Sequence, residues 1–302
     1  AGLGTVGVGT LELLAKQDGL LTERCGRPLR VTAVSARDRT RDRGVDLSSF
    51  QWFDDAAEMA AEADADVVVE LIGGTDTARE LVLTAIKNGK HIVTANKALI
   101  AEHGNEIFQA AHQNGVDVAF EAAVAGGIPI LKSLGEGLAA NHINWVAGII
   151  NGTGNYILSQ MESEGRSFAD ALASAQALGY AEADPTFDVE GIDAAHKLTV
   201  LGALAFRIGF RFDDVYTEGI SEVTVEDIEY ARQLGYQIKH LGLARVGPDG
   251  VQMRVHPTLI PDGQLLASVN GVMNAVLVNG NATGDTLYYG AGAGALPTAS
   301  SV

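Results

Sequence analysis

Cysteine is almost missing from this 302-residue chain, which has Cys25 alone. A single cysteine excludes an internal disulfide and fits a protein of the reducing cytoplasm. Cys25 falls between a predicted helix and a predicted strand, away from any sheet edge, which argues against a thiol nucleophile. The seven histidines show no pair at metal-ligand spacing, so a zinc site has little support.

Long apolar runs and positive charge are also scarce. Runs such as "VVVELI" and "LTVLGALAF" fall well short of the ~20 residues that span a bilayer, and no secretory leader is visible, so no membrane partner is expected. Lysine and arginine number 21 against 38 acidic residues, which gives a formal net charge of −17. Such a surface repels phosphate backbones and argues against nucleic acid as a partner.

What is present is a globular composition, 47% hydrophobic, with a strand–helix rhythm over the first 125 residues. The strands are nearly continuous in valine and isoleucine, which is typical of a parallel sheet covered on both faces. Strands are expected at 30–36, 66–72, 91–95 and 116–122, and helices at 54–64, 77–89 and 102–114. The pattern predicts a Rossmann-type α/β domain built from βαβ units.

After residue 126 the helices lengthen and the strands read as mostly antiparallel, which indicates a second, α+β domain. Helices are expected at 152–164, 168–178, 190–206 and 224–234, and strands at 237–246, 251–260, 274–280 and 285–290. We therefore divide the chain into a dinucleotide-binding domain (1–126, completed by 283–302) and a substrate-binding and dimerisation domain (127–282).

The motif "GLGTVG" matches G-x-G-x-x-G through Gly2, Gly4 and Gly7. Glycine there permits a tight turn, close approach of the backbone to a pyrophosphate, and close packing of helix on strand. The pattern alone is weak, but a helical run follows it and the strand at 30–36 comes at the βαβ distance. The loop from Gly2 through Leu3, Thr5 and Val6 is therefore predicted to bind NADP or NAD.

The second strand ends in "VSARDRTR" instead of the acid that usually holds the ribose of NAD. Arg37 falls where a 2′-phosphate would lie, which favours NADP. A solvated loop of mixed charge is an equal alternative, because Asp38 and Asp42 are interleaved with the arginines.

The stretch "HIVTANKAL" ends a buried strand and begins a helix, which places Thr94, Asn96 and Lys97 at the carboxyl edge of the sheet. Ligands bind at that edge in open α/β folds. Lysine is disfavoured at a helix N-terminus, so its presence there mildly favours a function.

A second group of charges lies in "ADPTFDVEGIDAAHKL", where Asp193 and Lys197 are i,i+4 on one helix face. Spacing alone favours a surface salt bridge. The turn "INGTGNYIL" could line a ligand or simply join a strand to a helix. The terminal "GAGAGALPTASSV", which includes Gly292, could return to the cofactor or be a loose end.

Together these motifs resemble those of the homoserine dehydrogenase family. They occur in the same order as in the family and cover nearly the whole chain. They are "GLGTVG", "VVVELIGG", "GKHIVTANKALIA", "EAAVAGGIPI", "INGTGNYIL", "GYAEADPTFDVEGIDAAHKL", "RVHPTLIP" and "YYGAGAGALPTAS". The resemblance implies reversible, NAD(P)-dependent interconversion of L-homoserine and L-aspartate 4-semialdehyde, towards threonine, methionine and isoleucine. It also suggests a homodimer. The regulatory C-terminal domain of some members has no counterpart among the motifs.

The resemblance also implies roles for the charged residues. Lys197 matches the family's proton donor, and Lys97 matches a second lysine near the nicotinamide. Glu182 and Asp193 match the carboxylates that hold the two ends of homoserine, and Gly179 offers a backbone contact. The neighbouring Asp184, Asp188 and Glu190 are expected to face solvent at the helix entry.

A monovalent cation, usually sodium, is a further implication of the resemblance. Its site maps to Glu121 and to the carbonyl groups of Val124, Gly126 and Ile128 in "EAAVAGGI". Oxygen ligands suit a hard cation. A hinge made of glycine turns is the alternative that the sequence alone favours.

Two other classes of protein share some of these features. A semialdehyde dehydrogenase would need an active-site cysteine, which the position of Cys25 does not supply. A dinucleotide-sensing regulator would leave the lysines and acids of the second domain without a purpose.

Overall fold

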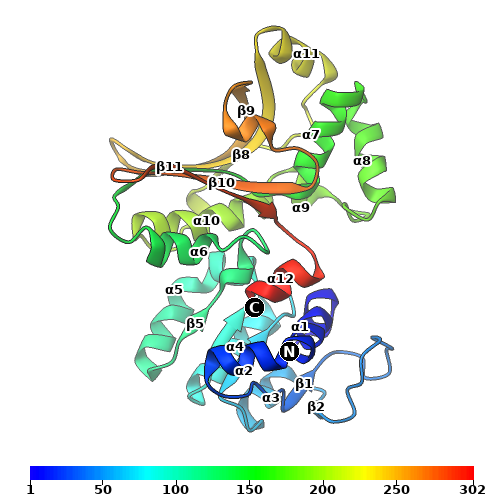
Figure 1. Ribbon diagram of the computed structural model, residues 1–302, viewed down its shortest axis with the longest axis vertical. Coiled ribbons are helices and arrows are strands. Elements are labelled where there is room, and N and C mark those ends of the chain that lie inside the picture. The colour runs from blue at the N-terminus through cyan, green and yellow to red at the C-terminus, as the bar shows by residue number, and fades with distance from the viewer. The chain divides into compact units, whose positions relative to one another are not determined.

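The computed structural model describes residues 1–302 and divides them into two compact units (Figure 1). The first unit consists of Ala1–Gly127 and Ala293–Val302, and the second of Ile128–Gly292. None of the helices has the length and apolar character needed to cross a membrane.

Two small parallel sheets form the centre of the first unit. One pairs β1 (Ala33–Ser35) with β2 (Gln51–Phe53), and the other has the order β3 (Val67–Glu70), β4 (His91–Thr94), β5 (Val118–Ala119). The helices of this unit are α1 (Thr5–Lys16), α2 (Asp18–Cys25), α3 (Ala56–Glu62), α4 (Asp76–Lys87), α5 (Lys97–Asn114), the short 3₁₀ turn η1 (Glu121–Ala123) and α12 (Ala295–Ser301).

Residues 1 and 2 connect the two sheets. The Ala1 nitrogen donates to Val69 O at 2.7 Å and the Ala1 carbonyl accepts from Leu71 N at 2.9 Å, which is the parallel pattern. Gly2 N donates to Ser35 O at 2.9 Å on the other side. The combined order, β2–β1–(1–2)–β3–β4–β5, is that of a dinucleotide-binding doubly wound fold. The α/β prediction is confirmed.

The core of this unit explains why its strands are apolar on both faces. Leu81, Ile86, Ile92, Leu99 and Ile107 from α4, β4 and α5 are all at most 1% exposed and form one cluster. Burying such side chains contributes on the order of 2 kcal/mol each, so the sheet is held between its helices by packing.

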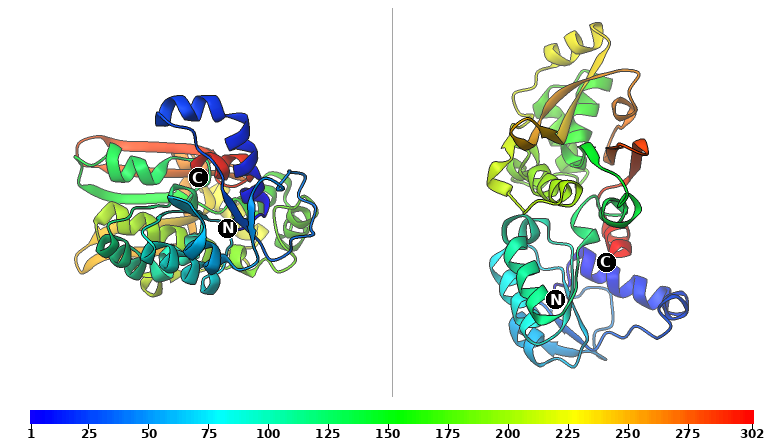
Figure 2. Two further views of the ribbon diagram at one scale, coloured as in Figure 1. Left: turned by 90° about the horizontal axis from the view of Figure 1, so that it is seen from below. Right: turned by 90° about the vertical axis from the view of Figure 1, so that its left-hand side faces the viewer.

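The second unit is built on a six-stranded sheet of order β11–β10–β6–β8–β9–β7. Figure 2 shows its last two strands, β10 and β11, side by side in orange and red. All its neighbours are antiparallel except β7 and β9. The strands are β6 (Ile143–Ile149), β7 (Tyr216–Thr217), β8 (Tyr236–Gly247), β9 (Gly250–Pro261), β10 (Met273–Gly280) and β11 (Gly284–Ala291).

Helices of the second unit pack on this sheet, with α10 against β6, β8 and β9 and with α7 against β8 and β10. The helical elements are α6 (Ile130–Lys132), the π turn η2 (Ser133–Gly137), α7 (Gly152–Glu164), α8 (Phe168–Ala177), α9 (Thr186–Val189), α10 (Ile192–Phe206), η3 (Phe212–Asp214), α11 (Val225–Gln233) and η4 (Leu265–Ser268).

Three differences from the sequence predictions concern the second unit and its boundary. The strand β6, which lies inside the sheet, was not expected, because asparagine and glycine interrupt its apolar run. The helix expected at 190–206 begins only at Ile192, as α10, because Gly191 before it has a left-handed backbone; the short helix α9 that precedes Gly191 was not expected. Residues 283–292 do not complete the first domain, because β11 hydrogen-bonds along its whole length to β10; only 293–302 lie in the first unit.

Candidate active site

The glycine loop has the geometry that dinucleotide binding requires. Gly2 has a left-handed backbone, φ +90°, and a Cβ there would overlap the carbonyl of Leu71. A Cβ on Gly7 would overlap the Gly2 carbonyl, so α1 can pack this closely only with glycine. Gly4, which caps α1, has nothing within 4 Å of its would-be Cβ. The first and third glycines are thus needed by the fold, and the second leaves open space at a helix N-terminus, where phosphate binds.

A cavity of about 370 Å³ opens beside this loop. Gly4 and Thr5 line it together with Glu12 from α1, and Arg41 and Arg43 line it from the loop after β1. The free N–H groups of the helix start suit a pyrophosphate, and the two arginines that line the same space suit a further phosphate group. A dinucleotide would be held here by its phosphates.

Arg43 fixes the arginine-rich loop to the glycine loop. Its Nε donates to Leu3 O at 3.2 Å, and its two Nη atoms donate to Arg41 O at 2.8 Å and Asp38 O at 2.5 Å. The guanidinium also lies 5.8 Å from the ring centre of Trp52. Arg37 is exposed and does not line the cavity. Arg37 and Arg43 lie in the same loop, but the contacts that distinguish Arg43 join residues that are far apart in the sequence.

At the carboxyl edge of the sheet, a buried network holds the turn that leads to Lys97. Thr94 Oγ1 donates to Glu70 Oε2 at 2.5 Å and accepts from Asn96 N at 2.9 Å, while the Asn96 side chain caps α5. Glu70 is fully buried and also accepts from Ile72 N at 2.7 Å. Lys97 is the first residue of α5 and is partly exposed. Glu70 was missed in the sequence, although an acid ending the apolar run "VVVE" was the available signal.

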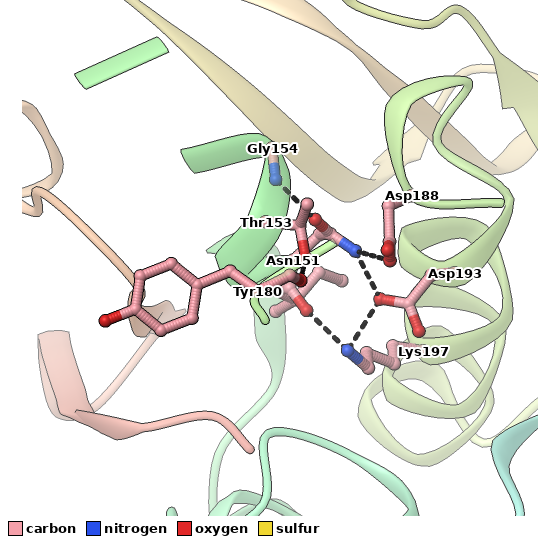
Figure 3. A network of polar contacts seen from close by, with 8 residues as sticks. Asn151, Thr153, Gly154, Tyr180, Asp188, Asp193 and Lys197 are labelled. Atoms are coloured by element: carbon pink, nitrogen blue, oxygen red, sulfur yellow. Dashed lines mark hydrogen bonds and ion pairs between the residues drawn. The ribbon is translucent and has the colours of Figure 1, made fainter. Parts of the chain in front are cut away.

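In the second unit, Lys197 and Asp193 form a buried ion pair (Figure 3). Lys197 Nζ lies 2.7 Å from Asp193 Oδ2 and donates to the Ile150 carbonyl at 2.7 Å. The two side chains are 12% and 7% exposed. The pair is therefore not the surface salt bridge that spacing alone favoured, and burial strengthens its mutual attraction.

Asn151 joins this pair to a second carboxylate (Figure 3). Its Nδ2 donates to Asp193 Oδ2 at 2.8 Å and to Asp188 Oδ1 at 2.7 Å, and its Oδ1 accepts from Gly154 N at 2.7 Å. Asp188 belongs to the network, so the expectation that it faces solvent was wrong. The signal for it was the turn "INGTGNYIL", whose asparagine begins α7.

The other predicted substrate residues lie on the segment between α8 and α9. Gly179 is exposed with φ +75°, and the Glu182 side chain is exposed. Thr153 Oγ1 donates to the Tyr180 carbonyl at 2.6 Å, which ties this segment to the first turn of α7, beside Asn151. Backbone groups of the segment are therefore held next to the polar network.

His240 lies under the starts of α7 and α10 and is 6% exposed. Its Nε2 is 2.8 Å from the Glu218 carbonyl. Burial lowers the pKa of His240, so the ring is neutral near neutral pH.

The segment predicted to hold a cation has an unusual backbone. Ala125 and Gly126 both have positive φ, +56° and +48°. The Gly126 carbonyl accepts from Ser301 Oγ at 2.6 Å, and the Ile128 carbonyl accepts from Ile130 N at 2.8 Å. A carbonyl has two lone pairs, so each keeps capacity for a cation. No three His, Cys, Asp or Glu side chains gather as a metal site.

Gly292 was predicted to contact the cofactor. In the second unit, a Cβ at this position would overlap the Asn274 side chain, which is 1% exposed on β10. The close approach of Asn274 is therefore sufficient to explain why residue 292 is a glycine, without a cofactor contact.

Gly4 and Gly7 differ in the space around their would-be Cβ atoms, and this difference gives a first prediction. Gly4→Ala should fold normally but weaken NADP binding by about 10- to 100-fold, because a methyl group there blocks charge-assisted backbone bonds that contribute about 1.5–3 kcal/mol. Gly7→Ala should lower both NADP affinity and the melting temperature, since its Cβ overlaps the Gly2 carbonyl. Fluorescence titration and thermal unfolding measure the two effects. Equal melting losses in both variants would contradict this division of roles.

The doubly wound sheet, the glycine loop and the buried lysine–carboxylate pair define an NAD(P)-dependent oxidoreductase. Two family profiles match the chain: "Homoserine dehydrogenase, NAD binding domain" over residues 2–121 and "Homoserine dehydrogenase" over residues 129–302. The chain belongs to the homoserine dehydrogenase family.

Individual relatives agree with the family profiles. The homoserine dehydrogenases of Pseudomonas aeruginosa and Neisseria gonorrhoeae are 62% and 58% identical to the chain over its full length, and the chain spans 69% of each. A crystal structure of a homoserine dehydrogenase from Thiobacillus denitrificans has a TM-score of 0.97 and 58% identity, covering 99% of this chain and 69% of that one. A hyperthermophilic archaeal homoserine dehydrogenase in complex with NADPH has a TM-score of 0.84 at 25% identity, covering 99% of this chain and 92% of that one.

The chain is thus an enzyme that acts on a CH–OH group with a nicotinamide cofactor. The semialdehyde dehydrogenase and the dinucleotide-sensing regulator considered from the sequence are not favoured. Cys25, which the first of these would have needed as a nucleophile, is an exposed residue at the end of α2.

Proposed function

We propose that Lys197 is the proton carrier when the chain interconverts L-homoserine and L-aspartate 4-semialdehyde. The observation that carries this proposal is the buried Lys197–Asp193 pair at 2.7 Å. In aldehyde reduction, the Lys197 ammonium gives a proton to the carbonyl oxygen as it becomes a hydroxyl. In homoserine oxidation, the neutral amine takes that proton back. A bound nicotinamide would supply the hydride to the carbonyl carbon in reduction and accept it from that carbon in oxidation.

The neighbours of Lys197 support this role by fixing the ammonium group. Asp193 Oδ2 and the Ile150 carbonyl each accept one of its three protons. The third is then available to a substrate oxygen. Holding the donor before the substrate arrives lowers the entropic cost of reaching the transition state.

We assign substrate recognition to residues around this lysine. Homoserine carries an ammonium group, which carboxylates attract. Asp193 and Glu182 are proposed to hold the two polar ends of the substrate, with the Gly179 backbone as a further contact. Lys97 is proposed as a second lysine for proton transfer, on the cofactor-binding unit.

On the cofactor side, Gly2, Leu3, Gly4, Thr5, Val6 and Gly7 are proposed to bind the pyrophosphate. Thr94, Lys97 and Gly292 are proposed as further cofactor contacts, with Lys97 near the nicotinamide. NADP is proposed as the preferred cofactor because the cavity carries Arg41 and Arg43. The NADPH complex of the archaeal relative is consistent with this choice.

The arginine loop gives a second prediction. Arg43→Lys keeps the charge but cannot reproduce the planar fork that reaches three carbonyls. It should weaken NADP binding by about 10-fold or more, roughly one charge-assisted bond, and weaken NAD binding less. Arg39→Lys is the matched control, since Arg39 also lies over Trp52, at 5.7 Å, but does not line the cavity.

Fluorescence titration of both cofactors reads out these affinities. Arg37→Ala in the same experiment tests the sequence prediction, since a residue that contacts the 2′-phosphate must discriminate NADP from NAD. Equal losses for the two cofactors in Arg43→Lys would refute the role of this loop in cofactor choice.

We further propose a monovalent cation, as Na⁺, on the carbonyl groups of Val124, Gly126 and Ile128 with Glu121. The positive φ of Ala125 and Gly126 supports a backbone shaped for carbonyl ligation. The cation would supply charge to hold this segment, and no proton or hydride step passes through it.

A homodimer through the large sheet is also proposed. The face of the sheet opposite α10 carries an apolar hollow of about 140 Å³ lined by Trp145, Leu241, Leu259, Leu266 and Leu277. Leu259 is 53% exposed, and exposed apolar patches commonly mark interfaces.

We place the enzyme in the cytoplasm, in threonine, methionine and isoleucine biosynthesis.

A spectrophotometric assay tests the reaction. Reduction of NADP should depend on added L-homoserine, and the same assay with NAD ranks the two cofactors. Absence of L-homoserine-dependent reduction with either cofactor would overturn the proposal.

A further inference from the structure

We propose that Asn151 is a positioning residue that sets which carboxylate oxygen faces Lys197. This inference rests on the proposed role of Lys197 and adds a residue to which neither motif nor relative assigned a function. It stands on three hydrogen bonds made by one side chain that is 6% exposed.

The first bond explains why a capping residue stands at 151. Asn151 is the N-cap of α7, and its Oδ1 accepts from Gly154 N at 2.7 Å. Serine, threonine and aspartate serve that purpose about as well as asparagine. Capping alone therefore does not require an asparagine here.

The other two bonds do require it. The amide nitrogen Nδ2 has two protons, and they go to different carboxylates, Asp188 on α9 and Asp193 on α10. Neither serine nor threonine has two donors, and aspartate has none when ionised. The Asn151 side chain thus connects the starts of α7 and α10 to α9, as Figure 3 shows.

The consequence for catalysis lies in one oxygen atom. Asp193 Oδ2 accepts from Asn151 at 2.8 Å and from Lys197 Nζ at 2.7 Å. Because Asn151 is anchored by the helix cap, it holds this oxygen in place and so holds the ammonium that the oxygen orients. The amide also separates two nearby carboxylates that would otherwise repel each other when brought together.

Asn151→Asp is the decisive substitution. It keeps the size of the side chain and the cap but replaces the two-proton donor by an acceptor that faces two carboxylates. We expect kcat to fall by about 100-fold, the typical cost of misplacing a reacting group, with NADP affinity unchanged. Asn151→Ser keeps a cap and removes the donors without adding charge, and should lose about 10-fold, near the value of one hydrogen bond.

Asn279→Asp is the matched control. Asn279 Nδ2 donates to the Asp285 carboxylate at 2.6 Å on the exposed β10–β11 hairpin, so the change creates the same carboxylate contact away from the site. Its kcat should equal that of the unsubstituted chain. Melting temperatures of all three variants separate loss of fold from loss of positioning.

Turnover of Asn151→Asp within about threefold of the unsubstituted chain overturns the inference. If that variant fails to fold, Asn151→Ser decides, and normal kcat there overturns it equally. If Lys197→Met is inactive and Asn151→Asp has normal turnover, only the positioning role of Asn151 is refuted. If Lys197→Met is active, the proposal that Lys197 carries the proton is refuted.

Discussion

Lys197→Met should lower kcat by about 10²- to 10⁴-fold, the range that a positioned general acid or base contributes. NADP affinity should stay the same, because the glycine loop and its cavity belong to the other unit. The effect should appear in kcat more than in the KM for L-homoserine, since the proton is transferred in the transition state.

Loss of fold is the competing explanation for Lys197→Met, since it leaves the Asp193 carboxylate buried without its cation. Lys197→Arg controls for this, because arginine keeps the charge but replaces the compact ammonium by a planar group whose much higher pKa prevents it from giving up its proton. The Lys197→Arg variant should preserve the melting temperature and still lose most turnover. Near-normal turnover of either variant would remove Lys197 from the reaction.

Asp193→Ala should have the second-largest effect, a fall in kcat/KM of about 100-fold or more. The change strands Lys197, which is 12% exposed, and removes a proposed contact with the substrate. Initial rates over a range of L-homoserine concentrations give kcat and KM separately. We expect kcat to fall and KM to rise in Asp193→Ala, whereas Lys197→Met should change mainly kcat.

Asp193→Asn separates charge from geometry. A single oxygen, Oδ2, accepts from both Lys197 and Asn151, so an amide oxygen can take its place and keep both hydrogen bonds. This variant should therefore retain more activity than Asp193→Ala and lose only the charge-assisted part. If the two variants are equally impaired, the carboxylate's charge alone matters; if neither is impaired, Asp193 has no part in the site.

The first unit could largely be predicted from the sequence, because its signals are local. The motif at Gly2, Gly4 and Gly7 encodes the tight turn and close packing directly, and each βαβ unit is contiguous. Arg43 could not be selected over Arg37, since its bonds to Leu3 O and its contact with Trp52 join residues distant in sequence.

The site in the second unit was less visible, because an i,i+4 Asp–Lys pair looks the same on a surface and in an interior. Lys197 donates to the Ile150 carbonyl, and Asp193 accepts from Asn151. Each of these partners lies more than 40 positions away in the sequence. The role proposed for Lys197 came from the family resemblance, whereas spacing alone had favoured a surface salt bridge. Asp188 was missed for the same reason, since its partner is also Asn151.

A crystal structure of the chain with NADPH and L-homoserine tests the central claim most directly. Reduced cofactor and alcohol cannot react with each other, so the complex is stable. We predict Lys197 Nζ within hydrogen-bond distance, about 2.6–3.2 Å, of the substrate hydroxyl oxygen, with Asp193 Oδ2 still bonded to Nζ and Asn151. A hydroxyl oxygen bound by Lys97 or by water, with Lys197 out of reach, would contradict the assignment of Lys197 as the proton carrier.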